Sequence, residues 1–165
     1  MPETDKNEFY TLKGYQMRSG RAMTETMEDY LEMICRLAGE DGHVRIHLLA
    51  AKLNVRPSSA SKMVGSLKTL NLVEYERYGL IRPSPRGLEI GKYLLHRHEV
   101  LSKFFCLLNA SENALEQVEQ IEHFISRETV SNLEALIVRI RALDLAEQKG
   151  TPNLEEGEDT THSNA

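Results

Sequence analysis

The sequence has few of the features that indicate an enzyme, a disulfide-stabilised protein or a membrane protein. Its two cysteines, Cys35 and Cys106, form no C-x-x-C pair, which argues against a zinc ribbon or a redox dithiol and favours reduced core thiols. No phosphate-binding loop, nucleophile motif, cofactor fingerprint or internal repeat occurs. The first 22 residues hold no apolar run of the length that a signal peptide or membrane helix needs. These absences predict a cytoplasmic protein that is not an enzyme.

Charge is distributed unevenly along a chain of otherwise ordinary globular composition. The net charge is −5, yet residues 43–104 hold eleven Lys and Arg against four acidic residues, and the flanking parts are strongly acidic. A basic segment between acidic flanks favours contact with a polyanion such as nucleic acid. A solvated surface with a chance excess of cations is the alternative explanation.

Apolar residues at helical spacing predict three helices in the first half of the chain. The first follows Thr24 or Thr26, either of which can serve as N-cap, and stops at a glycine-flanked turn. A short helix is predicted over 46–53 and a third over about 57–70. Pro57 suits the first helical position, where a missing backbone N–H costs nothing.

Two strand-like runs at 72–76 and 80–83, joined by Arg77-Tyr78-Gly79, predict a β-hairpin after the third helix. Helix-turn-helix followed by a hairpin is a winged helix. The third helix presents small polar and cationic side chains, which suits approach to base edges, although a solvated face explains them equally well when the helix is taken alone. The candidate DNA-binding residues are Arg56, Pro57, Ser58, Ser59, Ser61 and Lys62 on or next to this helix, and Arg77 and Arg82 on the hairpin.

The second half of the chain is predicted to be helical. The Ser-Pro pair at 84–85 reads as N-cap and first helical residue of a stretch reaching about Leu108, with a kink or break allowed within it. Ser111 is expected to cap a further helix to about Ile125, and a last helix covers roughly 128–143. These helices carry more apolar surface than a monomer of this size hides, which predicts a helical dimer interface.

Residue types that bind divalent metals occur in three separate segments. The candidates are Asp29 and Glu32 in the first helix, His98 in the long helix, and Glu119, Glu122 and His123 in the helix that follows. Residues at i, i+3 and i+4 share one helix face, so the last three are expected to converge on one ion. A solvated face, or a hydrogen-bonded histidine, explains each segment alone. A dinuclear metal enzyme is an alternative from another class, but it leaves the hairpin and the basic segment unexplained.

Four runs of sequence together resemble the diphtheria toxin repressor family, with its manganese transport regulator branch as the closer match. The runs are MEDYLE (27–32), RPSSASKMV (56–64), HRHE (96–99) and EQIEH (119–123). They occur in the family's order over about 24–143. The family's larger members carry a further SH3-like domain, for which this chain is too short.

The resemblance implies a mainly α-helical protein with two domains, while the leader lies outside the family pattern and the tail is inferred from its acidic composition. We expect a flexible leader over 1–23, a winged helix-turn-helix domain over 24–84, a helical dimerisation and metal-binding domain over 85–143, and a disordered acidic tail over 144–165. It also implies a homodimer that binds a palindromic operator in double-stranded DNA. Repression of manganese uptake genes when Mn²⁺ is bound is the expected activity, with no membrane association.

Position by position, the resemblance assigns all six metal candidates to a site for two Mn²⁺ ions per protomer, bridged by Glu119 and Glu122. Iron-responsive relatives place sulfur ligands where this chain has Asp29 and Glu119, so the substitutions favour a harder ion. Affinity alone cannot select manganese, because it rises along the divalent series toward copper. We therefore expect the larger coordination shell of Mn²⁺ to complete a cluster that smaller ions leave incomplete. An iron-responsive regulator of the same family is the alternative.

Overall fold

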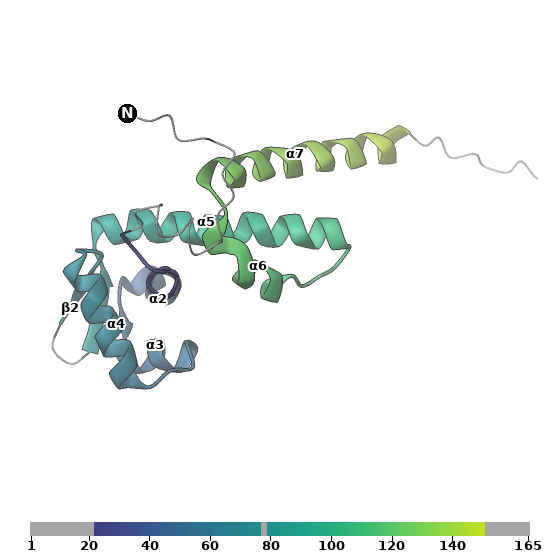
Figure 1. The fold of residues 1–165 in the computed structure, drawn as a ribbon. Helices are drawn as coiled ribbons and strands as arrows, with labels where there is room; N and C mark the ends of the chain where they lie inside the picture. Colours follow the sequence, from purple (N-terminus) through teal and green to yellow (C-terminus); the bar gives the residue numbers. More distant parts are fainter. Residues whose placement is uncertain (1–21, 77–78, 151–165) are drawn as a thin grey trace, which may run out of the picture. The chain divides into compact units, whose positions relative to one another are not determined.

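The computed structural model describes residues 22–76 and 79–150, which form two compact units with their boundary between His98 and Glu99 (Figure 1). The long helix α5, Pro85–Asn109, contributes residues to both units. No helix among the described residues is long and apolar enough to cross a membrane.

The first unit begins with three helices whose ends agree closely with the sequence-based expectation. Helix α2 spans Glu25–Ala38, and the Thr24 hydroxyl caps it by accepting a hydrogen bond from the Met27 N–H at 3.3 Å. Helix α3 spans Ile46–Lys52 and helix α4 spans Pro57–Thr69, with proline at the first helical position. Capping and proline chemistry are local, which explains why the sequence located these helices.

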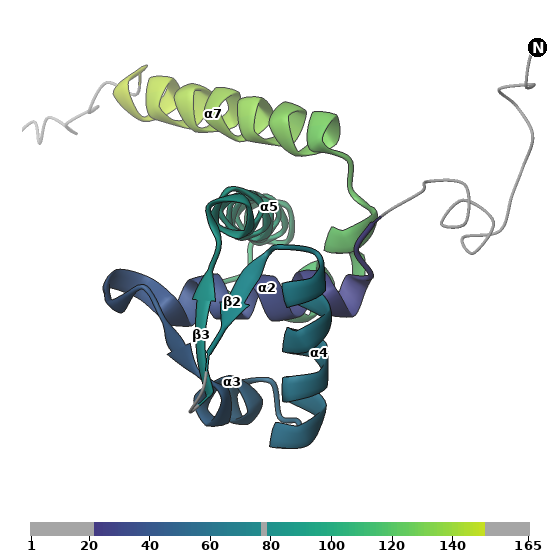
Figure 2. The ribbon, with the colours of Figure 1, turned by 90° about the vertical axis from the view of Figure 1, so that its left-hand side faces the viewer.

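A three-stranded antiparallel sheet completes the first unit and confirms the winged helix (Figure 2). Strand β2, Val73–Tyr75, and strand β3, Leu80–Pro83, form the expected hairpin. Strand β1, Val44–Arg45, pairs with the other side of β3, so the spatial order is β1-β3-β2. The sequence analysis missed β1 because two residues are too few to show alternation.

One hydrophobic core holds the helices and sheet of the first unit together. Residues with essentially no exposed surface come from α2, α3, α4, β3 and the loop before β2; they include Leu31, Ile34, Leu49, Val64, Leu67, Leu72 and Ile81. Burying a side chain of this size stabilises the fold by about 1.5–3 kcal/mol. The opposite face of α4 is thereby left toward solvent.

Gly87, in the first turn of helix α5, lies close to the backbone of Leu72, the residue before strand β2. Ser84 caps the helix by accepting a hydrogen bond from the Gly87 N–H at 3.0 Å, and the Ser84 N–H donates to the Leu72 carbonyl at 2.9 Å. A Cβ at position 87 would lie 1.8 Å from that carbonyl oxygen. Because the obstacle is backbone, no side-chain rotation relieves the clash.

We therefore expect Gly87→Ala to destabilise the fold by about 1–3 kcal/mol, the usual cost of overpacking. Gly65→Ala is the matched control, since a Cβ in the middle of α4 meets no atom within 4 Å. Alanine there is expected to be neutral or stabilising by up to about 1 kcal/mol, because it is the better helix former. Thermal unfolding of both variants checks the pair, and equal melting temperatures would show that position 87 tolerates a side chain.

The second unit contains the end of α5, then α6 (Leu115–Ile121), the 3₁₀ turn η3 (Glu122–Phe124) and α7 (Arg127–Gly150). The continuous course of α5 to Asn109 confirms the predicted long helical stretch, without a break. Two small apolar clusters stabilise this unit. One joins Val100 to α7, and the other joins Leu101 to the start of α6.

The expected helix from Ser111 to about Ile125 is wrong at both ends. Ser111 accepts a hydrogen bond from the Asn113 N–H at 3.2 Å, and Asn113 Oδ1 accepts from the Leu115 N–H at 2.9 Å. These contacts hold the segment in turns, so α6 starts at Leu115. At the other end, Ile121 has φ −123°, which separates α6 from η3.

Helix α7 is longer than the sequence pattern predicted. It runs seven residues past Leu143 to Gly150, so residues 144–150 are helical and are not part of a disordered tail. Its buried side, with Val130 and Ile137, packs on the end of α5. Four large apolar side chains of α7 remain exposed in the single chain: Leu136, Val138, Leu143 and Leu145. The leader and the remaining acidic tail lie almost entirely outside the described residues.

Candidate functional site

The N-terminal half of α4 presents most of the predicted DNA-binding residues to solvent. Ala60, Val64 and Leu67 of this helix are buried in the core. On the outer side, exposed side chains follow one another from the N-cap: Arg56, Pro57, Ser58, Ser59 and Lys62. Small hydroxyls beside two cations at the start of a helix allow close approach to base edges and phosphates.

Two other predicted DNA-binding residues, Ser61 and Arg82, have different surroundings. Ser61 is half-buried, and its hydroxyl lies 3.1 Å from the Tyr75 hydroxyl, so it contacts the wing strand. Arg82 on β3 pairs with Glu76 at 3.6 Å and is half-buried. Arg77 lies outside the described residues.

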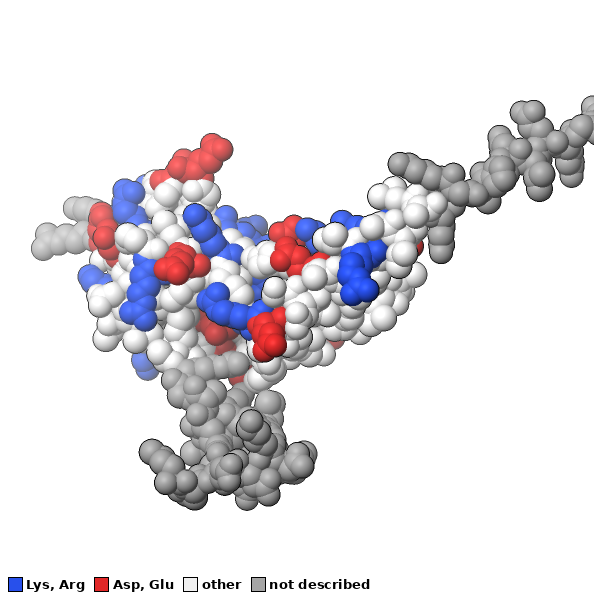
Figure 3. All heavy atoms as spheres, turned by 90° about the horizontal axis from the view of Figure 1, so that it is seen from above, with Lys and Arg blue, Asp and Glu red and all other residues white. Residues whose placement is uncertain are grey.

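Charge on the molecular surface is mixed. Over the face shown in Figure 3, Lys and Arg side chains alternate with Asp and Glu side chains, so that face offers no continuous basic field. The excess of Lys and Arg in residues 43–104 therefore does not make this face uniformly basic.

Three of the metal candidates belong to the first unit. Asp29 and Glu32 lie one turn apart on α2, and His98 lies on α5. Glu32 is 8% exposed, and its Oε1 accepts a hydrogen bond from Arg36 Nη2 at 2.7 Å. The Arg36 guanidinium therefore lies next to the carboxylate that we expect to bind metal.

Next to these candidates, a buried ion pair joins helices α2 and α5. Arg97 is 3% exposed, and its Nη2 donates to Glu28 Oε2 at 2.9 Å. The pair directly precedes Asp29 in one helix and His98 in the other. The sequence analysis did not identify it, because the partners are 69 positions apart and neither residue belongs to a spacing pattern.

The other three metal candidates belong to the second unit and do not share one helix. Glu119 is exposed on α6, whereas Glu122 and His123 are buried in the turn η3. Within that turn, Glu122 Oε1 and His123 Nε2 are 4.0 Å apart. The expectation of one continuous helix face is therefore wrong, since α6 ends before the last two residues.

Cys35 does not join these residues as a thiolate. Burial, with a smaller contribution from the negative charge of Glu32, raises the pKa of the Cys35 thiol to about 11. Cys35 is therefore protonated at neutral pH, and a protonated thiol is a poor metal ligand. Both cysteines are free and half-buried, as expected for reduced thiols near a core.

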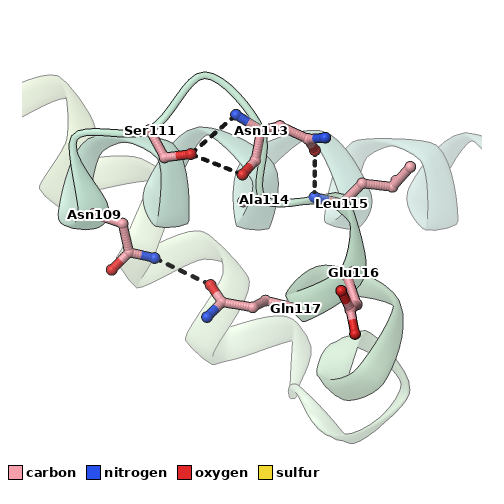
Figure 4. Close-up of a pocket in the computed structure, with 7 residues that line it drawn as sticks. All are labelled: Asn109, Ser111, Asn113, Ala114, Leu115, Glu116 and Gln117. Atoms are coloured by element: carbon pink, nitrogen blue, oxygen red, sulfur yellow. Dashed lines mark hydrogen bonds between the residues drawn. The ribbon is translucent and has the colours of Figure 1, made fainter.

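A polar pocket of about 330 Å³ occupies the connection between α5 and α6 (Figure 4). Its walls are tied by short-range hydrogen bonds, including one from Asn109 Nδ2 to Gln117 Oε1 at 3.0 Å. The lining residues are Asn109, Ser111, Asn113, Ala114, Leu115, Glu116 and Gln117. None of the predicted site residues lies among them.

Comparison with known protein families finds two adjacent matches. A model described as the iron dependent repressor N-terminal DNA-binding domain matches residues 22–80. A second, described as the iron dependent repressor metal-binding and dimerisation domain, matches residues 84–142. Their order along the chain is the one that the resemblance implied.

Individual proteins and solved structures agree with this match. The transcriptional regulator MntR of Geobacillus kaustophilus is 39% identical over 115 residues, covering 69% of this chain and 82% of the relative. MntR of Bacillus pumilus is 37% identical over 115 residues, covering 69% and 80%.

The structure of the manganese regulator SloR is similar with a TM-score of 0.60 and 26% identity, covering 70% of this chain and 54% of that one. For IdeR of T. acidophilum the TM-score is 0.54 and the identity 26%, covering 68% and 53%. The chain thus spans about half the length of these solved structures. With both domain models matched in order, and with the resemblance to the diphtheria toxin repressor family confirmed, the chain belongs to the iron dependent repressor family.

Proposed function

We propose that the protein is a cytoplasmic, manganese-responsive transcriptional regulator. As a homodimer, it binds a palindromic operator and represses manganese uptake genes when Mn²⁺ is bound. The observation that carries this proposal is an exposed row of small polar and cationic residues on α4 of a winged helix. That winged helix is followed by a metal-binding and dimerisation domain. The relatives named MntR support manganese as the signal.

DNA recognition is assigned to the exposed side of α4. In a helix-turn-helix protein, the second helix enters the major groove with its N-terminal residues against the base edges. Ser58 and Ser59 are the small residues at that end, and Lys62 is within reach of either phosphate or base. Arg56 and Arg82 supply phosphate contacts. Neutralising phosphates makes the affinity fall steeply with salt.

Metal binding is assigned to four carboxylates and two imidazoles. The residues are Asp29, Glu32, His98, Glu119, Glu122 and His123. This donor set fits manganese, because carboxylate oxygen suits hard divalent ions and no thiolate competes. The burial of Glu32, Glu122 and His123 also fits, since charged groups interact more strongly with a cation where water is excluded. Two ions per protomer, bridged by Glu119 and Glu122, are the stoichiometry that we propose.

Control by metal follows from where the six residues lie in the chain. Asp29 and Glu32 belong to the DNA-binding domain matched over residues 22–80, and the other four belong to the metal-binding and dimerisation domain matched over residues 84–142. When bound, the metal supplies positive charge and fixed coordination directions that both sets of carboxylates and imidazoles can share. Fixing the two units relative to each other would hold the α4 helices of a dimer about 34 Å apart, the spacing of successive major grooves.

The first experiment is selection of bound duplexes from a random DNA pool, with chelator in one arm and with Mn²⁺, Fe²⁺ or Zn²⁺ at matched occupancy in the others. We expect one palindrome to be enriched with Mn²⁺ and none with chelator. Enrichment by all three ions alike would remove manganese specificity, and enrichment by Fe²⁺ alone would establish the iron-responsive alternative. Equal enrichment with chelator would leave DNA binding in place but remove the metal control.

Membership of a family of transcriptional regulators removes the support for a dinuclear metal enzyme.

A further inference from the structure

Tyr75 contacts helix α4 at two points two turns apart. Its hydroxyl lies 3.1 Å from the Ser61 hydroxyl, and its backbone carbonyl accepts a hydrogen bond from Lys68 Nζ at 3.2 Å. Ser61 and Lys68 are seven residues apart, which is close to two helical turns and places them on the same side of α4. Tyr75 of the sheet thus contacts α4, the helix proposed to read DNA and called the reading helix below, at two positions two turns apart.

The position of Tyr75 in the hairpin gives these contacts their significance. Tyr75 is the last residue of β2, which lies beside α4, and it pairs with Ile81 on β3 (Figure 2). Directly after it, the Glu76 N–H donates to the Leu80 carbonyl at 2.9 Å and starts the wing tip. Strand β2 therefore ends at the residue that contacts α4.

Two other hydroxyls on α4, those of Ser66 and Thr69, are used differently. Ser66 donates to the Lys62 carbonyl and Thr69 donates to the Gly65 carbonyl, so both bond within their own helix. A hydroxyl in the middle of a helix commonly donates to the carbonyl four residues earlier in this way. The Ser61 hydroxyl instead lies within hydrogen-bond distance of the Tyr75 hydroxyl on β2, a strand of the hairpin that forms the wing. Lys68, likewise, directs its charge to a carbonyl of the hairpin.

We propose that Tyr75 is a positioning residue that ties the wing to the reading helix, so that α4 and Arg82 meet DNA as one preformed surface. This inference rests on the proposed DNA binding by α4 and the wing. Tyr75 is half-buried and need not touch DNA itself. Its hydroxyl lowers the conformational cost of binding because the two elements are already held in the bound arrangement.

A double-mutant cycle between Tyr75→Phe and Arg82→Ala tests the proposal on the full-length protein with Mn²⁺ and the selected operator. Phenylalanine removes the hydroxyl but keeps the ring that packs on the core. We expect Tyr75→Phe to weaken operator binding by about 2- to 10-fold, the range for one lost hydrogen bond. Arg82→Ala is expected to reduce operator affinity clearly less in the Tyr75→Phe background than in the parent. The reason is that a hairpin no longer held by the Tyr75 hydroxyl does not position Arg82 against phosphate.

Ser66→Ala is the matched control, since it removes a hydroxyl from α4 without touching the wing and is expected to leave the cycle unchanged. If Arg82→Ala reduced operator affinity equally in both backgrounds, the positioning role would be overturned. It would also be overturned if Arg82→Ala left operator affinity unchanged in both backgrounds, because Arg82 on the hairpin would then make no DNA contact. Lys62→Ala reports separately on the reading helix. If that variant binds operator normally, the proposed use of α4 fails.

Discussion

Asp29→Ala is expected to reduce the Mn²⁺-dependent gain in operator affinity by about 5- to 150-fold, the factor that corresponds to a coupling free energy of roughly 1–3 kcal/mol. The change removes one carboxylate from the DNA-reading unit, and the same result is expected when Glu119→Ala removes one from the other unit. The fold is expected to persist, because neither residue belongs to a hydrophobic cluster. Operator affinity across a manganese titration, with calorimetry of metal binding, is the measurement.

Matched controls separate loss of a ligand from loss of charge. Asp41→Ala removes an exposed acid from the first unit, and Glu116→Ala removes one from α6, the helix of Glu119. Both controls are expected to keep the parental manganese response. If Asp29→Ala and Glu119→Ala repressed like the parent at every manganese concentration, metal would not couple the two units.

Arg97→Met is expected to destabilise the first unit by about 3–5 kcal/mol, the largest stability effect that we anticipate in this chain. Arg97 is almost fully buried, and its loss leaves the Glu28 carboxylate, largely buried itself, without its cationic partner. Methionine keeps much of the length of the arginine stem, so the loss of charge dominates the loss of packing. Urea unfolding in the presence of chelator measures the effect free of any contribution from bound metal.

The double variant Glu28→Gln with Arg97→Met serves as the control for this prediction. It removes both charges, and it is expected to recover a substantial part of the lost stability, because an unpaired buried charge costs more than an absent pair. A double variant no more stable than Arg97→Met alone would show that packing, and not charge, accounts for the loss.

Sequence reasoning located the elements whose boundaries depend on neighbouring residues. The start of α4 at Pro57 and the start of α5 at Ser84 were predicted correctly, and the cap of α2, Thr24, was one of the two candidates. Each boundary depends on a side chain or ring that acts within three residues. The hairpin was found for the same reason, since its turn composition is local.

Features that depend on specific tertiary contacts were not predictable in this way. Strand β1 exists because β3 offers it a partner, and the pattern of two residues carries no period. The helix expected from Ser111 failed because Asn113 competes for the backbone N–H of Leu115, an outcome that helix propensity alone does not reveal. Residue types identified the candidate metal ligands, but spacing misjudged the backbone that carries Glu122 and His123.

The exposed apolar side chains of α7 imply that operator occupancy depends on protein concentration through dimer formation. Leu136, Val138, Leu143 and Leu145 are uncovered in the single chain, and α7 begins within the family's dimerisation domain. For a protein that binds DNA as a dimer, halving the total concentration lowers the dimer concentration by more than half. Both the number of chains and the fraction of chains that are paired decrease. For the proposed repressor, operator occupancy therefore falls more steeply than protein abundance.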